Sequence, residues 1–144
     1  MALKLKKGIK ELLAEANAEI QTLTPAEALA LKDDPNLTLV DLRDIRELER
    51  DGRVPGAFHA PRGMLEFWVD PESPYHKEIF ASGKRFVFFC AGGLRSALAA
   101  QTVQRMGLAP VAHIEGGFKA WKEAGGPVDE RKPDERTSRS AKRA

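Results

Sequence analysis

The chain has 144 residues, of which 42% are hydrophobic and 31% are charged, with a formal net charge of +2. This size and composition fit one soluble globular domain with its own core. No apolar run approaches the roughly 18 residues that a membrane helix needs. The N-terminus also lacks the features of a secretory signal. A cytoplasmic location without membrane contact is therefore expected.

The distribution of basic residues and the single cysteine exclude further classes. Residues 1–10 and 136–144 are basic and carry no acid. A nucleic-acid site usually spreads over a folded face, so a basic surplus that lies at the two ends predicts no nucleic-acid partner. One cysteine rules out an internal disulfide and a cysteine-only metal site, and the three histidines are too scattered to hold a metal.

The first predicted element is an N-terminal amphipathic helix over residues 1–19, because its apolar residues recur at helical spacing. Two interpretations remain open: the helix packs on its own domain, or it pairs two chains in a homodimer. A second helix is expected from Thr24, which can cap it, with Pro25 at its first position and Glu27 closing a capping box.

Short strands alternate with helices through the main domain, predicted over residues 20–126. The expected strands include NLTLVDLRD, a short one in VPGAFHAP, KRFVFFC and PVAHIEGG, and the helices between them include DIRELERDG and LRSALAAQTVQRMG. This alternation predicts an α/β fold with a mostly parallel sheet and helices on both faces. From Pro127 onward the chain is polar, and residues 127–144 are predicted to be a disordered basic tail.

Cys90 follows a strand that is apolar on both faces, at the edge where open α/β sheets bind ligands. The helix after it directs its positive N-terminus at the loop, and Gly92 and Gly93 allow the loop N–H groups to turn inward. Arg95 adds a permanent positive charge. These features favour the thiolate, which is the nucleophilic form. The alternative is a buried cysteine that acts only as a small hydrophobe.

The spacing within CAGGLR separates two kinds of chemistry. Four residues lie between Cys90 and Arg95, one fewer than in cysteine phosphatases, so the cradle is expected to be too small for a phosphate and suited to a terminal sulfur. The residues expected to bind the substrate form the loop: Ala91, Gly92, Gly93, Leu94 and Ser96, the last as a hydrogen-bonding residue at the helix start.

Three motifs in order resemble the rhodanese family of sulfurtransferases, as a single-domain member: VDLRDIRELERDGRVPGAFHAP, CAGGLRS and GGFKAWKEAGGPV. The resemblance spans roughly residues 20–126 and implies a central, mostly parallel five-stranded sheet. It implies that Cys90 takes the outer sulfur of a donor such as thiosulfate as a persulfide, without another cofactor. Cyanide, a thiol or a protein cysteine then accepts the sulfur. The six-residue loop matches the sulfur-transferring branch, whereas related arsenate reductases and phosphatases have a longer loop.

Four further residues are expected to support the site. Asp41 and Arg43 match the family's Asp-x-Arg pair and would brace the loop, although a purely structural ion pair fits equally well. Glu47 ends the same motif and is expected either near the pocket or, by preference, on the solvated helix surface. Arg62 has no neighbouring acid in the sequence and would meet an anionic donor at the mouth of the site.

Two other functions stay open. The chain could be a persulfide carrier or a rhodanese-like binding module in a sulfur relay, or, less in keeping with the short loop, a phosphatase or arsenate reductase. Ala91 and Leu94 stand where a cation would meet the second charge of thiosulfate. This leaves persulfides and thiosulfonates open as donors.

Overall fold

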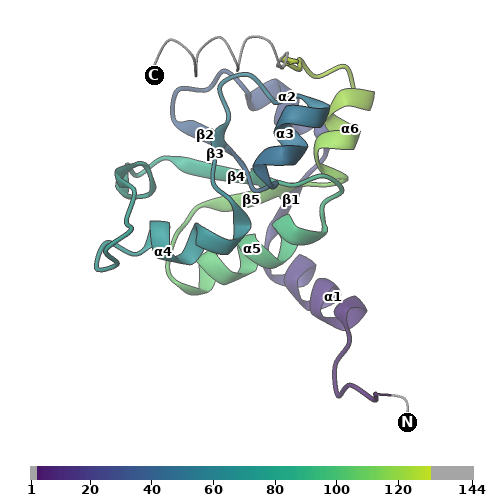
Figure 1. The fold of residues 1–144 in the computed structure, drawn as a ribbon, viewed down its shortest axis with the longest axis vertical. Coiled ribbons are helices and arrows are strands. Elements are labelled where there is room, and N and C mark those ends of the chain that lie inside the picture. The colour runs from purple at the N-terminus through teal and green to yellow at the C-terminus, as the bar shows by residue number, and fades with distance from the viewer. Residues whose placement is uncertain (1–2, 131–144) are drawn as a thin grey trace.

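In a computed structural model that describes residues 3–130, the chain forms a five-stranded sheet between two layers of helices (Figure 1). The strand order is β1-β5-β4-β2-β3, and all four pairings are parallel. The strands are β1 (Gln21–Leu23), β2 (Leu37–Asp41), β3 (Phe58–His59), β4 (Arg85–Phe89) and β5 (Val111–Ile114). The predicted α/β fold with a five-stranded sheet is confirmed.

The helices divide between the two faces of the sheet (Figure 1). One face is covered by α1 (Ile9–Glu19), α4 (Leu65–Val69) and α5 (Leu94–Arg105). The other is covered by α2 (Pro25–Leu31), α3 (Ile45–Asp51) and α6 (Gly117–Glu123). Two short 3-10 turns, Arg62–Met64 and Glu78–Ala81, flank α4 in the chain. The predicted capping box of α2 is present, with reciprocal hydrogen bonds between Thr24 and Glu27.

The central strand β4 contributes to both hydrophobic cores. Phe86 and Phe88 pack with α1, α4 and α5, whereas Val87 and Phe89 pack with α2 and α6. All four residues are fully buried. Burying such a side chain contributes about 1.5–3 kcal/mol, so the strand is anchored from both sides and its carboxyl end is rigidly placed.

The register of the sheet brings the chain segments of the candidate site to one edge. Asp41, the last residue of β2, is paired with Phe89, the last residue of β4. The residues that follow these strands, Leu42 and Cys90, therefore leave the sheet side by side. The next strand, β5, ends at Ile114 and leads through a glycine pair into α6.

The N-terminal helix is shorter than predicted. It begins at Ile9 because Gly8, in an extended conformation, is its N-cap, so the prediction of helix for residues 3–7 is wrong. Ala16 is buried against the α5 side of the core, and α1 thus packs on its own domain. Ile9 and Leu12 are 58% and 41% exposed, and a dimer contact through this helix stays a prediction.

The domain also extends further towards the C-terminus than predicted. Trp121 Nε1 donates to the carbonyl oxygen of Pro127 at 2.9 Å, and Arg53 and Asp129 exchange two backbone hydrogen bonds. Val128 packs against the core on the α6 side. The disorder predicted from Pro127 is therefore wrong for residues 127–129, because these contacts hold them, and residues 131–144 of the predicted tail lie outside the described residues. Within residues 3–130 no helix is long and apolar enough to cross a membrane.

Candidate active site

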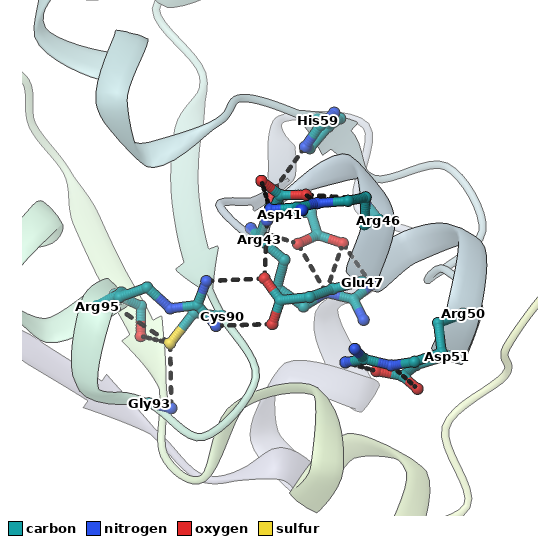
Figure 2. A network of polar contacts seen from close by, with 12 residues as sticks. Asp41, Arg43, Arg46, Glu47, Arg50, Asp51, His59, Cys90, Gly93 and Arg95 are labelled. Carbon is teal, nitrogen blue, oxygen red and sulfur yellow. Dashed lines mark hydrogen bonds and ion pairs between the residues drawn. The ribbon is translucent and has the colours of Figure 1, made fainter.

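Cys90 directly follows β4 and begins a tight loop that leads into α5. The residue is 1% exposed. Two backbone N–H groups point at its sulfur. The nitrogen of Gly93 lies 3.2 Å from Sγ (Figure 2), and that of Ser96 lies 3.4 Å from it. These donors and the positive end of α5 stabilise negative charge on the sulfur. The loop is thus arranged to hold a sulfur anion.

The N-terminal turn of α6 fixes the outer side of the same loop. The N–H of Phe118 donates to the carbonyl oxygen of Cys90 at 2.8 Å, and that of Lys119 donates to the carbonyl of Ala91 at 3.2 Å. Gly117 has φ +61°, and a Cβ added there would lie 2.4 Å from the Cys90 oxygen. Because these carbonyls turn outward to α6, the loop N–H groups can turn inward. The motif GGFKAW was visible in the sequence, but only the fold shows that it contacts the Cys90 loop.

Glu47 and Arg95 form an ion pair beside the sulfur (Figure 2). Both guanidinium nitrogens Nη1 and Nη2 of Arg95 donate to the carboxylate of Glu47 at 2.9 Å. The capping box of α3 orients this carboxylate, which also accepts the N–H of Asp44 at 2.8 Å. The preferred prediction, that Glu47 lies on the solvated surface of its helix, is wrong. The fold brings this helix to Arg95, 48 positions away in the chain.

This pair changes the electrostatics of both partners. The hydrogen bond with Arg95 lowers the pKa of Glu47, so the carboxylate is ionised at neutral pH. The same bond raises the pKa of Arg95, and Cys90 contributes to that rise to a smaller degree. The guanidinium therefore lies within electrostatic reach of the sulfur, while its fork is directed at Glu47.

Asp41 and Arg43 form a buried ion pair on the same side of the loop. Their side chains are each 1% exposed, and Arg43 Nη2 lies 2.7 Å from Asp41 Oδ2. Arg43 also donates to the carbonyl of Gly52 at 2.9 Å and stacks over the ring of Phe118, 3.9 Å from its centroid. Arg43 thereby connects the pair to Phe118, whose N–H donates to the Cys90 carbonyl, and a bracing role for the pair stays a prediction.

Ser96 connects the sulfur to His113, a buried histidine of β5 that the sequence motifs do not assign to the site. Ser96 Oγ lies 3.7 Å from Cys90 Sγ and 2.9 Å from His113 Nδ1. His113 Nε2 in turn lies 3.1 Å from Asn17 Oδ1 on α1. Burial lowers the pKa of His113, so its imidazole is neutral at neutral pH. Cys90 and His113 are 23 positions apart, and no local motif signals their approach.

The remaining predicted residues lie at the surface or pair elsewhere. Arg62 Nη1 bonds to Glu66 Oε1 at 2.7 Å, so the premise that it is unpaired is wrong, and the i,i+4 spacing of the two residues is a signal that sequence reasoning missed. In the loop, Gly92 is exposed, Ala91 is half-buried and Leu94 is 61% exposed. Among residues 3–130, no three His, Cys, Asp or Glu side chains gather as metal ligands would.

Comparison with known proteins identifies close structural relatives. A Rhodopseudomonas palustris protein of unknown function, called a possible tyrosine phosphatase, is 60% identical with a TM-score of 0.87, covering 90% of this chain and 99% of its own. The polysulfide-sulfur transferase homodimer of Wolinella succinogenes is 31% identical with a TM-score of 0.65, covering 86% of this chain and 88% of its own.

Among curated proteins, the mouse thiosulfate sulfurtransferase/rhodanese-like domain-containing protein 3 is 28% identical over 104 residues, which is 69% of this chain. The chain spans 66% of the length of that relative and 55% of an uncharacterised relative from Synechocystis. The family model of the rhodanese-like domain matches residues 24–124, which hold strands β2 to β5, the Cys90 loop and helix α6. With that match over more than half of its length, the chain belongs to the rhodanese-like domain family.

Proposed function

We propose that this protein is a sulfurtransferase that carries sulfane sulfur as a persulfide on Cys90. The observation that carries the proposal is the setting of the sulfur, which has two backbone N–H groups at 3.2 and 3.4 Å and an arginine in electrostatic reach. The sulfur transferase from Wolinella succinogenes among the structural relatives supports the same class of reaction.

The reaction follows from a thiolate held in this loop. With thiosulfate, the Cys90 thiolate attacks the outer sulfur, the bond to the sulfonate sulfur breaks, and sulfite leaves with the bonding electrons. The terminal sulfur of the persulfide then carries the negative charge, which the loop N–H groups and Arg95 stabilise. An acceptor such as cyanide, a thiol or a protein cysteine attacks this terminal sulfur, and the Cys90 thiolate leaves. Cys90 itself carries the sulfur, so no other cofactor is required.

The composition of the loop bears on the donor. Ala91 and Leu94 carry no charge, and Leu94 is 61% exposed. Arg95, whose charge acts on the sulfur, is already paired with Glu47. A donor with one charge and an apolar group, such as an organic persulfide or thiosulfonate, meets this surface at least as well as doubly charged thiosulfate does.

The test is the intact mass of the reduced protein after incubation with thiosulfate, polysulfide and a thiosulfonate. We expect the wild type to gain one sulfur with at least one donor and to lose it when a thiol is added. The Cys90→Ser variant should gain none. A wild type that gains no sulfur with any of these donors would contradict the proposal.

A persulfide carrier is the alternative within the same chemistry. It is favoured by the uncharged loop residues Ala91 and Leu94, which offer no cation to a small anionic donor. Slow loading by small donors together with fast loading by a cysteine desulfurase and its substrate would identify a carrier. Equal loading by both routes would favour the enzyme.

A phosphatase is the second candidate, because the 60% identical Rhodopseudomonas palustris protein is called a possible tyrosine phosphatase. Two observations weigh against it for this chain. Arg95 directs both Nη1 and Nη2 at Glu47, although an arginine fork is the group that binds phosphate oxygens. The loop also holds only four residues between Cys90 and Arg95. We expect no hydrolysis of an aryl phosphate, and Cys90-dependent hydrolysis would replace the sulfurtransferase proposal.

A further inference from the structure

Polar side chains form a continuous path from the Cys90 sulfur to the surface of α1. Cys90 Sγ lies 3.7 Å from Ser96 Oγ, which lies 2.9 Å from His113 Nδ1. His113 Nε2 lies 3.1 Å from Oδ1 of Asn17, an exposed residue. Ser96 and His113 are 0% and 3% exposed, so water does not compete for their hydrogen bonds. The path starts at a buried thiol and ends at solvent.

The direction of each hydrogen bond follows from the end at α1. Asn17 Nδ2 donates to the carbonyl of Leu13 at 3.0 Å, so Asn17 presents its oxygen to His113. His113 must then carry its proton on Nε2, which leaves Nδ1 as an acceptor. Ser96 donates its hydroxyl hydrogen to Nδ1, and the Cys90 thiol donates to the Ser96 oxygen. Every donor in the path points away from the sulfur.

In this order the thiol hydrogen of Cys90 is held by the Ser96 oxygen, while the sulfur accepts the N–H groups of Gly93 and Ser96. These two N–H groups can stay on a thiolate, but the thiol proton must then go elsewhere. If Ser96 turned its hydroxyl hydrogen to the thiolate, the buried Nδ1 of His113 would lack a donor, which is unfavourable. Both requirements are met if the proton of Cys90 ends on Nδ1. We propose that Ser96 and His113 are a proton relay for Cys90, and that Asn17 is the positioning residue that fixes the histidine tautomer.

The relay is a neutral rearrangement of protons within the proposed sulfur transfer, on which this inference rests. The S–H bond of Cys90 breaks, the hydroxyl of Ser96 receives that proton and gives up its own, and an N–H bond forms at Nδ1. The products are a thiolate and an imidazolium, and no electrons are transferred. When the Cys90 thiolate leaves at the end of a cycle, the same path returns the proton.

Burial opposes a charge on His113, and the thiolate formed in the same step supplies the opposite charge that offsets this cost. Burial is the cause of its lowered pKa, and no charged neighbour contributes to the shift. β1 carries no titratable side chain. The titratable groups on the other elements packed around His113, and on the loop, are Lys10, Glu11, Glu15 and Glu19 of α1, Arg85 of β4, Cys90, and Arg95 and Arg105 of α5. Asn17 belongs to α1, which lies outside the family match.

The experiment is the rate of Cys90 alkylation by iodoacetamide as a function of pH. In the wild type, the thiolate–imidazolium state and the thiol–imidazole state hold the same number of protons, so their ratio does not depend on pH. As the pH is lowered, the alkylation rate should therefore stop falling and level off at a plateau. His113→Gln keeps a hydrogen-bonding side chain that takes up no proton. Its rate should fall about tenfold per pH unit, and lie about 10²-fold below the wild type on the plateau, a typical loss for a proton acceptor.

His76→Gln is the matched control, because the His76 ring bonds to the carbonyl of Trp68 and is not part of the path. It should keep the wild-type profile. Ser96→Ala should lose the plateau as His113→Gln does. Asn17→Asp places a carboxylate at Nε2, which favours the imidazolium, and should raise the plateau. This gain separates a relay from a purely structural role and does not depend on how well the other variants fold.

Three outcomes would overturn the relay: a wild-type profile without a plateau, a plateau that persists in His113→Gln, or an Asn17→Asp profile that matches the wild type. Alkylation requires no sulfur donor. A plateau in a protein that never gains sulfur would therefore leave the relay intact while contradicting the proposed function. A protein that forms the persulfide but shows no plateau would contradict the relay and leave the proposed function intact.

Discussion

The polar groups around the Cys90 sulfur fall into two halves that differ in charge. The charged half contains two ion pairs, formed by Asp41, Arg43, Glu47 and Arg95 (Figure 2). The neutral half is the path through Ser96, His113 and Asn17. The charged half can stabilise an anion, whereas the neutral half can move a proton without holding net charge at rest. In the proposed relay, the site thus assigns these two tasks to two separate sets of side chains.

Burial explains why each half has its chemistry. Arg95, the cation near the sulfur, has a side chain that is 41% exposed, so its charge stays partly solvated. His113 is 3% exposed, and burial lowers its pKa. A permanent charge at that position would be strongly disfavoured. Asp41 and Arg43 are buried as well, and they are stable there because they neutralise each other.

The largest expected effect comes from breaking the buried ion pair of the charged half. Asp41→Asn leaves the Arg43 guanidinium buried without its counter-charge, which should lower the free energy of unfolding by about 3–5 kcal/mol. Asp33→Asn is the control, because Asp33 forms an ion pair with Lys32 while its side chain is 88% exposed. That change should cost at most about 1 kcal/mol. Urea unfolding measures both, and equal losses would show that Asp41 is not essential to the brace.

A second variant disturbs the Cys90 loop, which contacts both halves. Gly117→Ala places a Cβ 2.4 Å from the Cys90 oxygen at φ +61° and should cost about 3 kcal/mol from clash and backbone strain together. Gly83→Ala is the matched control, with φ +78° and no atom within 4 Å of the added Cβ. It should cost only the strain, about 1–2 kcal/mol. If Gly117→Ala lowers the free energy of unfolding no more than Gly83→Ala does, the Cys90 loop can move away from α6 without a loss of stability.

A smaller effect is expected from the partly buried ion pair of Glu47 and Arg95. Glu47→Gln removes the charge that pairs with Arg95 and should lower stability by about 0.5–1 kcal/mol, since the pair is partly solvated. The pKa of Glu47 is lowered in the fold, so this contribution is present above the unfolded value of 4.5 and is lost as the pH falls through the folded value. Thermal unfolding at neutral and acidic pH should show the difference from wild type shrink in acid. A difference independent of pH would contradict the pairing.

The smallest expected effect concerns the neutral half. The folded pKa of His113 lies below its unfolded value of 6.5, so the unfolded chain binds the extra proton first. Stability should therefore be full above pH 6.5 and fall as the pH drops from there towards the folded value. Replacing His113 with Gln should remove this part of the pH dependence. A variant with the wild-type slope would show that His113 does not titrate on unfolding.

The sequence was sufficient for the features that depend on local pattern. The strand before Cys90, the glycine loop, the helix after it and the capping box at Thr24 each follow from residues within a few positions of one another. Alternating strands and helices also predicted the parallel sheet. The pattern did not reveal the three-residue edge strand β1, because a run of three residues shows no periodicity. Its partner strand β5 also lies some 90 residues later in the chain.

Long-range contacts account for what was missed in the site. Glu47 meets Arg95 across 48 positions, and Asn17 meets His113 across 96. No local motif marks either contact, and a solvated Glu47 was the natural expectation for a charged helix residue. The order at Pro127 likewise depends on Trp121 and on the distant Arg53. Only the pairing of Arg62 with Glu66 was visible in the sequence, as an i,i+4 pair.

The most direct test of the central claim is a single turnover of the loaded protein. The chain is incubated with the sulfur donor, freed of excess donor, and then mixed with cyanide while its intact mass is followed. We predict that one thiocyanate forms per loaded chain and that the mass returns to that of the reduced protein, with no product from Cys90→Ser. A loaded chain that keeps its sulfur, or thiocyanate production by Cys90→Ser, would contradict sulfur transfer through a Cys90 persulfide.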